Sequence, residues 1–163
     1  MYHKPVIMIS KSVIISAFQR SFYKHNDTKL LMKARLVQLP KITEPSRGSL
    51  TVVQKGEHFP FEIKRTYWTY DVPAGEWRGG HAHKECKELI LAVSGCFTLT
   101  LDDGREKAEF LLKNPFEAVL VEEGIWRELH DFSAGAVCLV MASEEFDEVD
   151  YIRDYDEFLE WVR

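Results

Sequence analysis

Residues 75–95 read GEWRGGHAHKECKELILAVSG, and this stretch decides the fold that the sequence predicts. It holds two histidines, His81 and His83, that are separated by one residue. Alternate side chains of an extended strand share a face, so both imidazoles should point the same way. The apolar run 89–93 predicts a second strand. Two imidazoles are therefore expected at one strand end, with the Glu88 carboxylate a short turn away.

The rest of the chain body has the pattern of short strands divided by turns. No helical period intervenes, which predicts an all-β sandwich or barrel of eight to ten strands. Residues 41–49 are interpreted as a turn and residues 124–136 as a mostly exposed connection. The other strands are expected at 36–40, 50–54, 61–71, 96–112 (two strands about an Asp-Asp-Gly turn), 116–124 and 137–142.

The strand expected at 61–71 carries polar groups on a face that looks interior. Phe61 and Ile63 precede Arg65 and Tyr67 on the same face. Because the first two are apolar, Arg65 and Tyr67 are expected to point into the barrel.

The C-terminal tail changes period. Asp154 followed three residues later by Glu157 is typical of a capping box. Phe158 and Trp161 lie on one apolar face of the segment that follows. A short C-terminal helix packed on the barrel, or on a second subunit, is predicted.

The length of the chain and the distribution of its charges indicate how many domains it has and where they begin. At 163 residues it fits one domain with a substantial core. Residues 1–35 carry seven Lys/Arg against one acid, whereas residues 36–163 carry 14 against 25. An acidic body argues against nucleic acid as a partner, and no apolar run reaches the roughly 18 residues that a membrane span needs. We expect residues 1–31 to be a basic, poorly ordered extension and residues 32–163 to be a single domain.

The number and spacing of the cysteines indicate the redox state of the compartment in which the protein works. Cys86, Cys96 and Cys138 form an odd set with no close pair. That pattern favours reduced thiols in a cytoplasmic protein, each cysteine serving as a small buried apolar residue.

The spacing in the opening stretch resembles the first sequence motif of the cupin superfamily of small β-barrels. Two histidines with Glu88 could form the two-His, one-carboxylate set that holds iron or manganese. Cupins commonly add a histidine three residues after a glycine in their second motif, but Arg127 stands there after Gly124. A guanidinium cannot ligate a metal and repels one, so metal binding is disfavoured.

The other interpretation of the histidines is metal-free acid–base chemistry. Imidazole titrates near neutrality, so a pair can remove and return protons, as a sugar isomerisation requires. A lone H-x-H would more often be two ordinary strand residues. Arg65 and Tyr67 on an interior face argue against that here, because buried polar groups are costly without a partner or a function.

Six segments, taken together and in order, resemble the WxcM-like sugar-nucleotide 3,4-ketoisomerases of the cupin superfamily. They are PSRGSL (45–50), PFEIKRTYW (60–68), RGGHAHKE (78–85), LDDG (101–104), GIWREL (124–129) and DEVDYIRDYDEFL (147–159). The resemblance implies a metal- and cofactor-independent jelly-roll cupin β-barrel that forms a homodimer. It also implies a dTDP-linked 4-keto-6-deoxyglucose as substrate. Its carbonyl would move from C4 to C3 through an enediol, on the way to 3-amino deoxysugars for surface polysaccharides or glycosylated products.

Carried over by position, the resemblance also assigns residues. His81 and His83 are the proton-moving pair, in either order. The residues that hold the diphosphate, sugar or base are Arg47, Arg65, Tyr67, Arg78, Trp126 and Arg127.

Three alternatives remain open at this point. One is a 3,5-epimerase, which would usually need an acid to orient its histidine base; none is evident at close spacing. The others are a metal-dependent cupin oxygenase and a non-catalytic cupin that senses a sugar or nucleotide.

Overall fold

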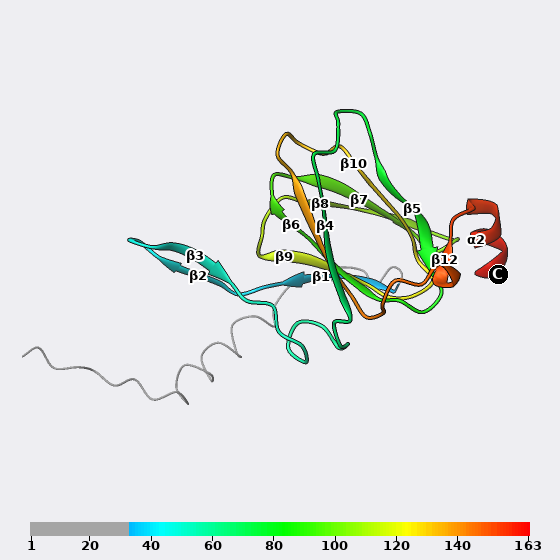
Figure 1. Ribbon diagram of the computed structural model, residues 1–163, viewed down its shortest axis with the longest axis horizontal. Helices are drawn as coiled ribbons and strands as arrows, with labels where there is room; N and C mark the ends of the chain where they lie inside the picture. Colours follow the sequence, from blue (N-terminus) through cyan, green and yellow to red (C-terminus); the bar gives the residue numbers. More distant parts are fainter. Residues whose placement is uncertain (1–32) are drawn as a thin grey trace, which may run out of the picture.

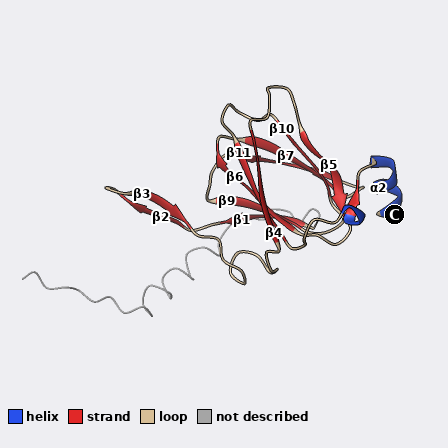
Figure 2. Cartoon of the chain, viewed as in Figure 1, coloured by secondary structure: helices blue, strands red, loops and turns tan. Residues whose placement is uncertain are grey.

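The computed structural model describes residues 33–163, so the expectation about residues 1–31 lies outside the described part. Within that part there are twelve strands, a 3₁₀ turn (η1, Glu148–Asp150) and one α-helix (α2, Tyr155–Trp161). The strands are β1 (Ala34–Gln38), β2 (Lys41–Glu44), β3 (Gly48–Thr51), β4 (Arg65–Tyr70), β5 (Arg78–His83), β6 (Glu88–Ser94), β7 (Phe97–Asp102), β8 (Lys107–Leu112), β9 (Glu117–Val121), β10 (Trp126–His130), β11 (Val137–Ala142) and β12 (Tyr151–Ile152). The prediction of an all-β body with a short C-terminal helix is confirmed (Figure 2), although there are more strands than the eight to ten expected.

Two five-stranded antiparallel sheets form the body (Figure 1). The first runs in the order β1-β9-β6-β11-β4 and the second in the order β12-β5-β10-β7-β8. Within residues 33–163 no ladder joins the sheets edge to edge, so the jelly roll is a sandwich rather than a closed barrel.

The main core lies between the two sheets. Alternate residues of β6 and β11 pack there against alternate residues of β7 and β10. A second apolar cluster covers the other face of β6, where Leu89 and Leu91 meet Phe59 and Phe61 of the loop before β4. Because β6 is buried on both faces, it has a continuous apolar run rather than an alternating one.

Three expectations about local structure were wrong. The segment 124–136 is not an exposed connection, because it contains β10, whose Trp126, Arg127 and Leu129 are buried. Ile63 precedes β4 and is 44% exposed, although Arg65 and Tyr67 do face inward on that strand.

The segment 41–49, expected as a turn, begins a hairpin. Among the described residues, strands β2 and β3 pair only with each other, from Lys41 opposite Thr51 to Glu44 opposite Gly48. The hairpin projects away from the sandwich, and its Ile42 and Leu50 are more than half exposed (Figure 1).

The C-terminal helix begins as predicted. The Asp154 side chain accepts a hydrogen bond of 2.9 Å from the Glu157 N–H at the start of α2. Phe158 is fully buried against Ala82, Trp126 and Ile152, on the outer face of the second sheet. No helix within residues 33–163 is both long and apolar enough to cross a bilayer.

A β-bulge interrupts the pairing of β5 with β10. The pairing register shifts between Arg127 and Glu128, where β10 passes Gly79. Gly79 has φ 89°, and a Cβ atom on it would lie 2.6 Å from the Arg127 carbonyl oxygen. Only glycine allows the two backbones to approach this closely.

Candidate active site

A group of polar side chains lies between the two sheets. His81 and His83 come from β5, and Arg127 comes from β10. Their strand neighbours Ala82 and Trp126 pack outward beneath α2. Because strand side chains alternate, the histidines and the arginine must point inward. The prediction that both imidazoles face one way is confirmed, and their ring centroids are 5.0 Å apart.

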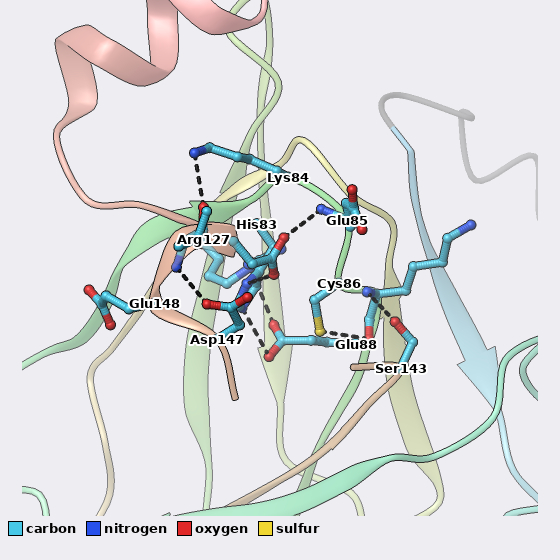
Figure 3. Close-up of polar contacts among 12 residues, drawn as sticks. His83, Lys84, Glu85, Cys86, Glu88, Arg127, Ser143, Asp147 and Glu148 are labelled. Atoms are coloured by element: carbon cyan, nitrogen blue, oxygen red, sulfur yellow. Dashed lines mark hydrogen bonds and ion pairs between the residues drawn. The ribbon is translucent and has the colours of Figure 1, made fainter. Parts of the chain in front are cut away.

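His83 lies at the centre of this group and is fully buried. Its Nδ1 is 2.7 Å from Oδ2 of Asp150, at the end of η1. Its Nε2 is 3.6 Å from Oε1 of Glu88, the first residue of β6. The ring is therefore flanked by a carboxylate on each side, as Figure 3 shows for Glu88.

The Glu88 carboxylate contacts several other side chains of the site. Its Oε1 accepts a hydrogen bond of 2.7 Å from the Tyr67 hydroxyl, and its Oε2 lies 3.4 Å from Arg127 Nε. Burial alone would raise the pKa of Glu88, but the Arg127 guanidinium holds it well below its usual range. Burial and the Glu88 charge raise the pKa of Tyr67. Glu88 is therefore ionised and Tyr67 is a neutral donor.

His81 has a different environment from His83. Neither of its ring nitrogens has a hydrogen-bond partner within residues 33–163. Burial and the nearby positive charge of Arg127 lower its pKa to about 3. His81 is thus neutral at physiological pH, with a lone pair free to accept a proton. The Tyr151 ring packs against both imidazoles. Its centroid is 5.0 Å from that of the His81 ring and 4.3 Å from that of the His83 ring.

Arg65 lies at the rim of the group. Its guanidinium is 5.3 Å from the centre of the Tyr67 ring and 5.7 Å from that of Phe146. The Nε atom has no hydrogen-bond partner in the described chain. A cation held between aromatic rings with a free donor is suited to binding an anionic group.

The structure brings together five of the eight residues predicted for the site. They are His81, His83, Arg65, Tyr67 and Arg127. The other three lie elsewhere in the single chain. Arg47 is at the tip of the β2–β3 hairpin, with its side chain 78% exposed and 3.5 Å from Glu44. Arg78 is exposed at the start of β5. Trp126 packs on Tyr155 and Phe158 beneath α2, which makes it a core residue.

Sequence reasoning missed two members of the site. Asp150 and Tyr151 reach the histidines because β12 pairs with β5, placing Tyr151 opposite His83. Asp150 is 67 residues from His83 in the chain, in a C-terminal segment rich in acidic residues. The acid that was not evident at close spacing is therefore supplied from a distance.

The site fits proton transfer better than metal binding. Arg127 is 1% exposed and faces Glu88, where its charge opposes a cation. A second set of donor atoms, one each on His83, Cys86 and Asp150, lies within 4.8 Å of one another. In that set His83 and Asp150 are already bonded to each other, and burial raises the pKa of the Cys86 thiol, which disfavours the thiolate a metal needs.

Two cavities lie near this part of the sandwich. One, of about 570 Å³, is lined by Lys64, Lys84, Phe146 and Asp150 among others and includes neither histidine. The larger, of about 660 Å³, is bounded by β1 and α2 and includes neither histidine. Asp150, which lines the first cavity, contacts His83 directly.

Comparison with known proteins gives one consistent family. The model of the WxcM-like, C-terminal family (FdtA) matches residues 32–163. The TDP-4-oxo-6-deoxy-alpha-D-glucose-3,4-oxoisomerase of Aneurinibacillus thermoaerophilus is 38% identical over 131 residues, covering 80% of this chain and 94% of the relative.

Solved structures agree in fold. A 3,4-ketoisomerase from Helicobacter canadensis superimposes with a TM-score of 0.77 at 38% identity, covering 80% of this chain and 98% of its own. QdtA, a sugar 3,4-ketoisomerase from Thermoanaerobacterium thermosaccharolyticum in complex with TDP, gives a TM-score of 0.78 at 32% identity. That match covers 81% of this chain and 96% of QdtA. The chain therefore belongs to the WxcM-like family of sugar-nucleotide 3,4-ketoisomerases and has the predicted cupin fold.

Proposed function

We propose that this isomerase moves the keto group of a TDP-linked 4-keto-6-deoxy-hexose from C4 to C3 through an enediol. The observation that carries the proposal is the pair of imidazoles, half-buried His81 and buried His83, with ring centroids 5.0 Å apart. A variant of the related QdtA has been crystallised with TDP-4-keto-6-deoxyglucose, which supports this substrate class.

The chemistry needs two kinds of proton transfer and no net loss of atoms. One imidazole takes the proton from C3 while the C4 carbonyl oxygen gains a proton, which forms the enediol. A proton then returns to C4, and the C3 hydroxyl loses its proton as the C3 carbonyl forms. Two adjacent imidazoles provide a base for the carbon and a carrier between the oxygens.

Charged residues around the pair suit the intermediate. Arg127 is buried, and within residues 33–163 none of its guanidinium nitrogens has a hydrogen-bond partner. It can therefore donate to the oxygen that gains negative charge as the enediol forms. In this proposal Arg65 holds the diphosphate and Tyr67 holds the sugar ring. The chain's own residues supply every proton transfer, so no metal or cofactor is invoked.

A homodimer would complete the binding site. Arg47 lies on a hairpin that leaves its own sandwich and exposes Ile42 and Leu50 (Figure 1). A second copy would cover these apolar residues and receive Arg47 near its own substrate. We place the enzyme in the cytoplasm. There it would act before an aminotransferase, in a route to 3-amino deoxysugars for surface polysaccharides or glycosylated products.

A 3,5-epimerase is the second candidate, and one observation favours it. Asp150 Oδ2 lies 2.7 Å from His83 Nδ1, so an acid is present beside a histidine, as an epimerase would usually need. Both reactions begin with proton removal next to the C4 carbonyl. They differ in whether the carbonyl moves.

The test is product analysis on TDP-4-keto-6-deoxyglucose. The purified protein is incubated with this substrate and EDTA, and products are followed by ¹³C NMR with and without a 3-aminotransferase. A signal for a C3 ketone, and amination at C3, are expected. Inversion at C3 or C5 with the carbonyl still at C4 would identify the epimerase. Loss of turnover under EDTA with recovery on adding iron or manganese would contradict metal-free catalysis.

A further inference from the structure

We propose that Asp150 is a positioning residue that fixes the ring orientation and tautomer of His83. This inference rests on the proposed function for its catalytic consequence, but its structural content stands alone. Asp150 Oδ2 is 2.7 Å from His83 Nδ1, and the imidazole is fully buried. A carboxylate oxygen accepts, so Nδ1 carries the proton and Nε2 is turned toward the interior.

The Asp150 carboxylate is itself held rigidly. Its Oδ1 accepts a hydrogen bond of 2.7 Å from the Glu85 N–H, in the turn after β5. Its carbonyl oxygen accepts a second bond of 2.9 Å from the Lys84 N–H. The β5–β6 turn therefore clamps Asp150 by two backbone groups that directly follow His83. Such a support keeps a proton-transfer group in one geometry without reorganisation during the reaction.

The other end of the imidazole explains why the tautomer matters. His83 Nε2 has no hydrogen-bond partner within residues 33–163, and it lies 3.6 Å from Glu88 Oε1. A lone pair at Nε2 can accept a proton from the substrate side. The positive ring that results would lie between the Asp150 and Glu88 carboxylates, which stabilise it. The opposite tautomer would occupy Nε2 with a proton before the reaction starts.

Asp150→Asn separates this role from a structural one. The Glu85 N–H needs an acceptor, so the asparagine carbonyl oxygen should keep the place of Oδ1. Its NH₂ group must then face Nδ1, which becomes an acceptor, and the ring proton moves to Nε2. The shape of the side chain and its hydrogen bond from the Glu85 N–H are therefore kept, while the His83 ring proton moves from Nδ1 to Nε2. In a comparable Asp–His pair this change lowers turnover by up to about 10⁴.

The matched control is Asp147→Asn. Asp147 begins the same 3₁₀ turn and accepts the Val149 N–H at 3.0 Å. It makes the same charge change in the same segment but has no contact with His83. We expect a kcat loss of about 10² to 10⁴ with KM changed less than threefold in Asp150→Asn. Asp147→Asn should keep kcat within threefold of the unaltered enzyme.

Ring ¹⁵N NMR of ¹⁵N-histidine-labelled protein tests the tautomer directly and needs no substrate. The unaltered protein should show the His83 proton on Nδ1, and Asp150→Asn should show it on Nε2. A lone pair on Nδ1 in the unaltered protein would overturn the proposal, even if the variant failed to fold. Equal kcat losses in the two aspartate variants would also overturn it. If the unaltered enzyme does not isomerise the sugar, the proposed function fails while the NMR result still decides the role of Asp150.

Discussion

Arg127 Nε lies 3.4 Å from Glu88 Oε2, and both side chains are only 1% exposed. A buried ion pair of this kind seldom stabilises a fold more than apolar residues of the same size would. It does place a fixed positive and a fixed negative charge beside the two imidazoles. The pair is best understood as part of the electrostatics of the active site.

Removing one partner of this pair should cost much more than removing both. Arg127→Met leaves Glu88 buried without its cation, so the free energy of unfolding should fall by about 3–5 kcal/mol. The double variant Glu88→Leu/Arg127→Met should recover most of that loss. Urea denaturation measures both. The control is Arg153→Met, which breaks an exposed pair with Glu148 and should cost at most about 1 kcal/mol. Equal losses in both arginine variants would contradict this account.

Acid should weaken the fold through His81. Burial and Arg127 lower the folded-state pKa of His81 from 6.5 to about 3. Between these values the unfolded chain binds a proton that the folded chain does not. The stabilisation is therefore complete above pH 6.5 and is lost progressively as the pH falls toward 3. From pH 6.5 to 5 the loss should be about 2 kcal/mol.

The His81→Asn variant should lack that part of the pH dependence. Its free energy of unfolding, measured at pH 7 and pH 5, should change less than that of the unaltered protein. His130→Asn, outside the histidine pair, should keep the full dependence. Parallel curves for His81→Asn and the unaltered protein would show that the folded chain binds the proton as readily as the unfolded one.

The two histidines should be individually essential and mutually dependent. His81→Asn and His83→Asn should each lower kcat by about 10² or more, and the double variant should lose less than the product of the two. KM should change little. Solvent deuterium should enter the reacting carbon in the unaltered enzyme, and much more slowly in the variant that lacks the carbon base. A folded double variant with near-normal turnover would place the chemistry elsewhere.

Mixed subunits should reveal whether Arg47 acts in a partner's site. Arg47→Ala and His83→Asn are each expected to be poorly active alone. After co-refolding in equal amounts, turnover should recover to about a quarter of the normal value, because half the dimers are mixed and each has one intact site. No recovery would mean that Arg47 and the histidines act within one subunit, whereas full activity of Arg47→Ala alone would mean that Arg47 is not used.

Local sequence patterns predicted the parts of the structure that depend on local physics. The alternation of His81 and His83 followed from strand geometry, and the start of α2 followed from the capping role of Asp154. Both features are determined by residues a few positions apart. The inward orientation of Tyr67 was predicted for the same reason.

What the sequence could not show depends on pairings between distant segments. Strand β10 looked exposed because Arg127 interrupts its apolar pattern, and only the folded chain reveals the Glu88 carboxylate that neutralises it. Asp150 was hidden for the same reason, since β12 brings it to His83 from 67 residues away. The position of Arg47 depends on where the hairpin points, which its own pairing does not determine.

The bulge at Gly79 allows the geometry of the active site to change while every catalytic side chain is kept. A methyl group at position 79 would press on the Arg127 carbonyl and displace β10. The guanidinium would then move relative to both imidazoles while every site residue stayed the same. A substitution at this one glycine, in evolution or by design, would thus change the reaction by moving the backbone that carries Arg127.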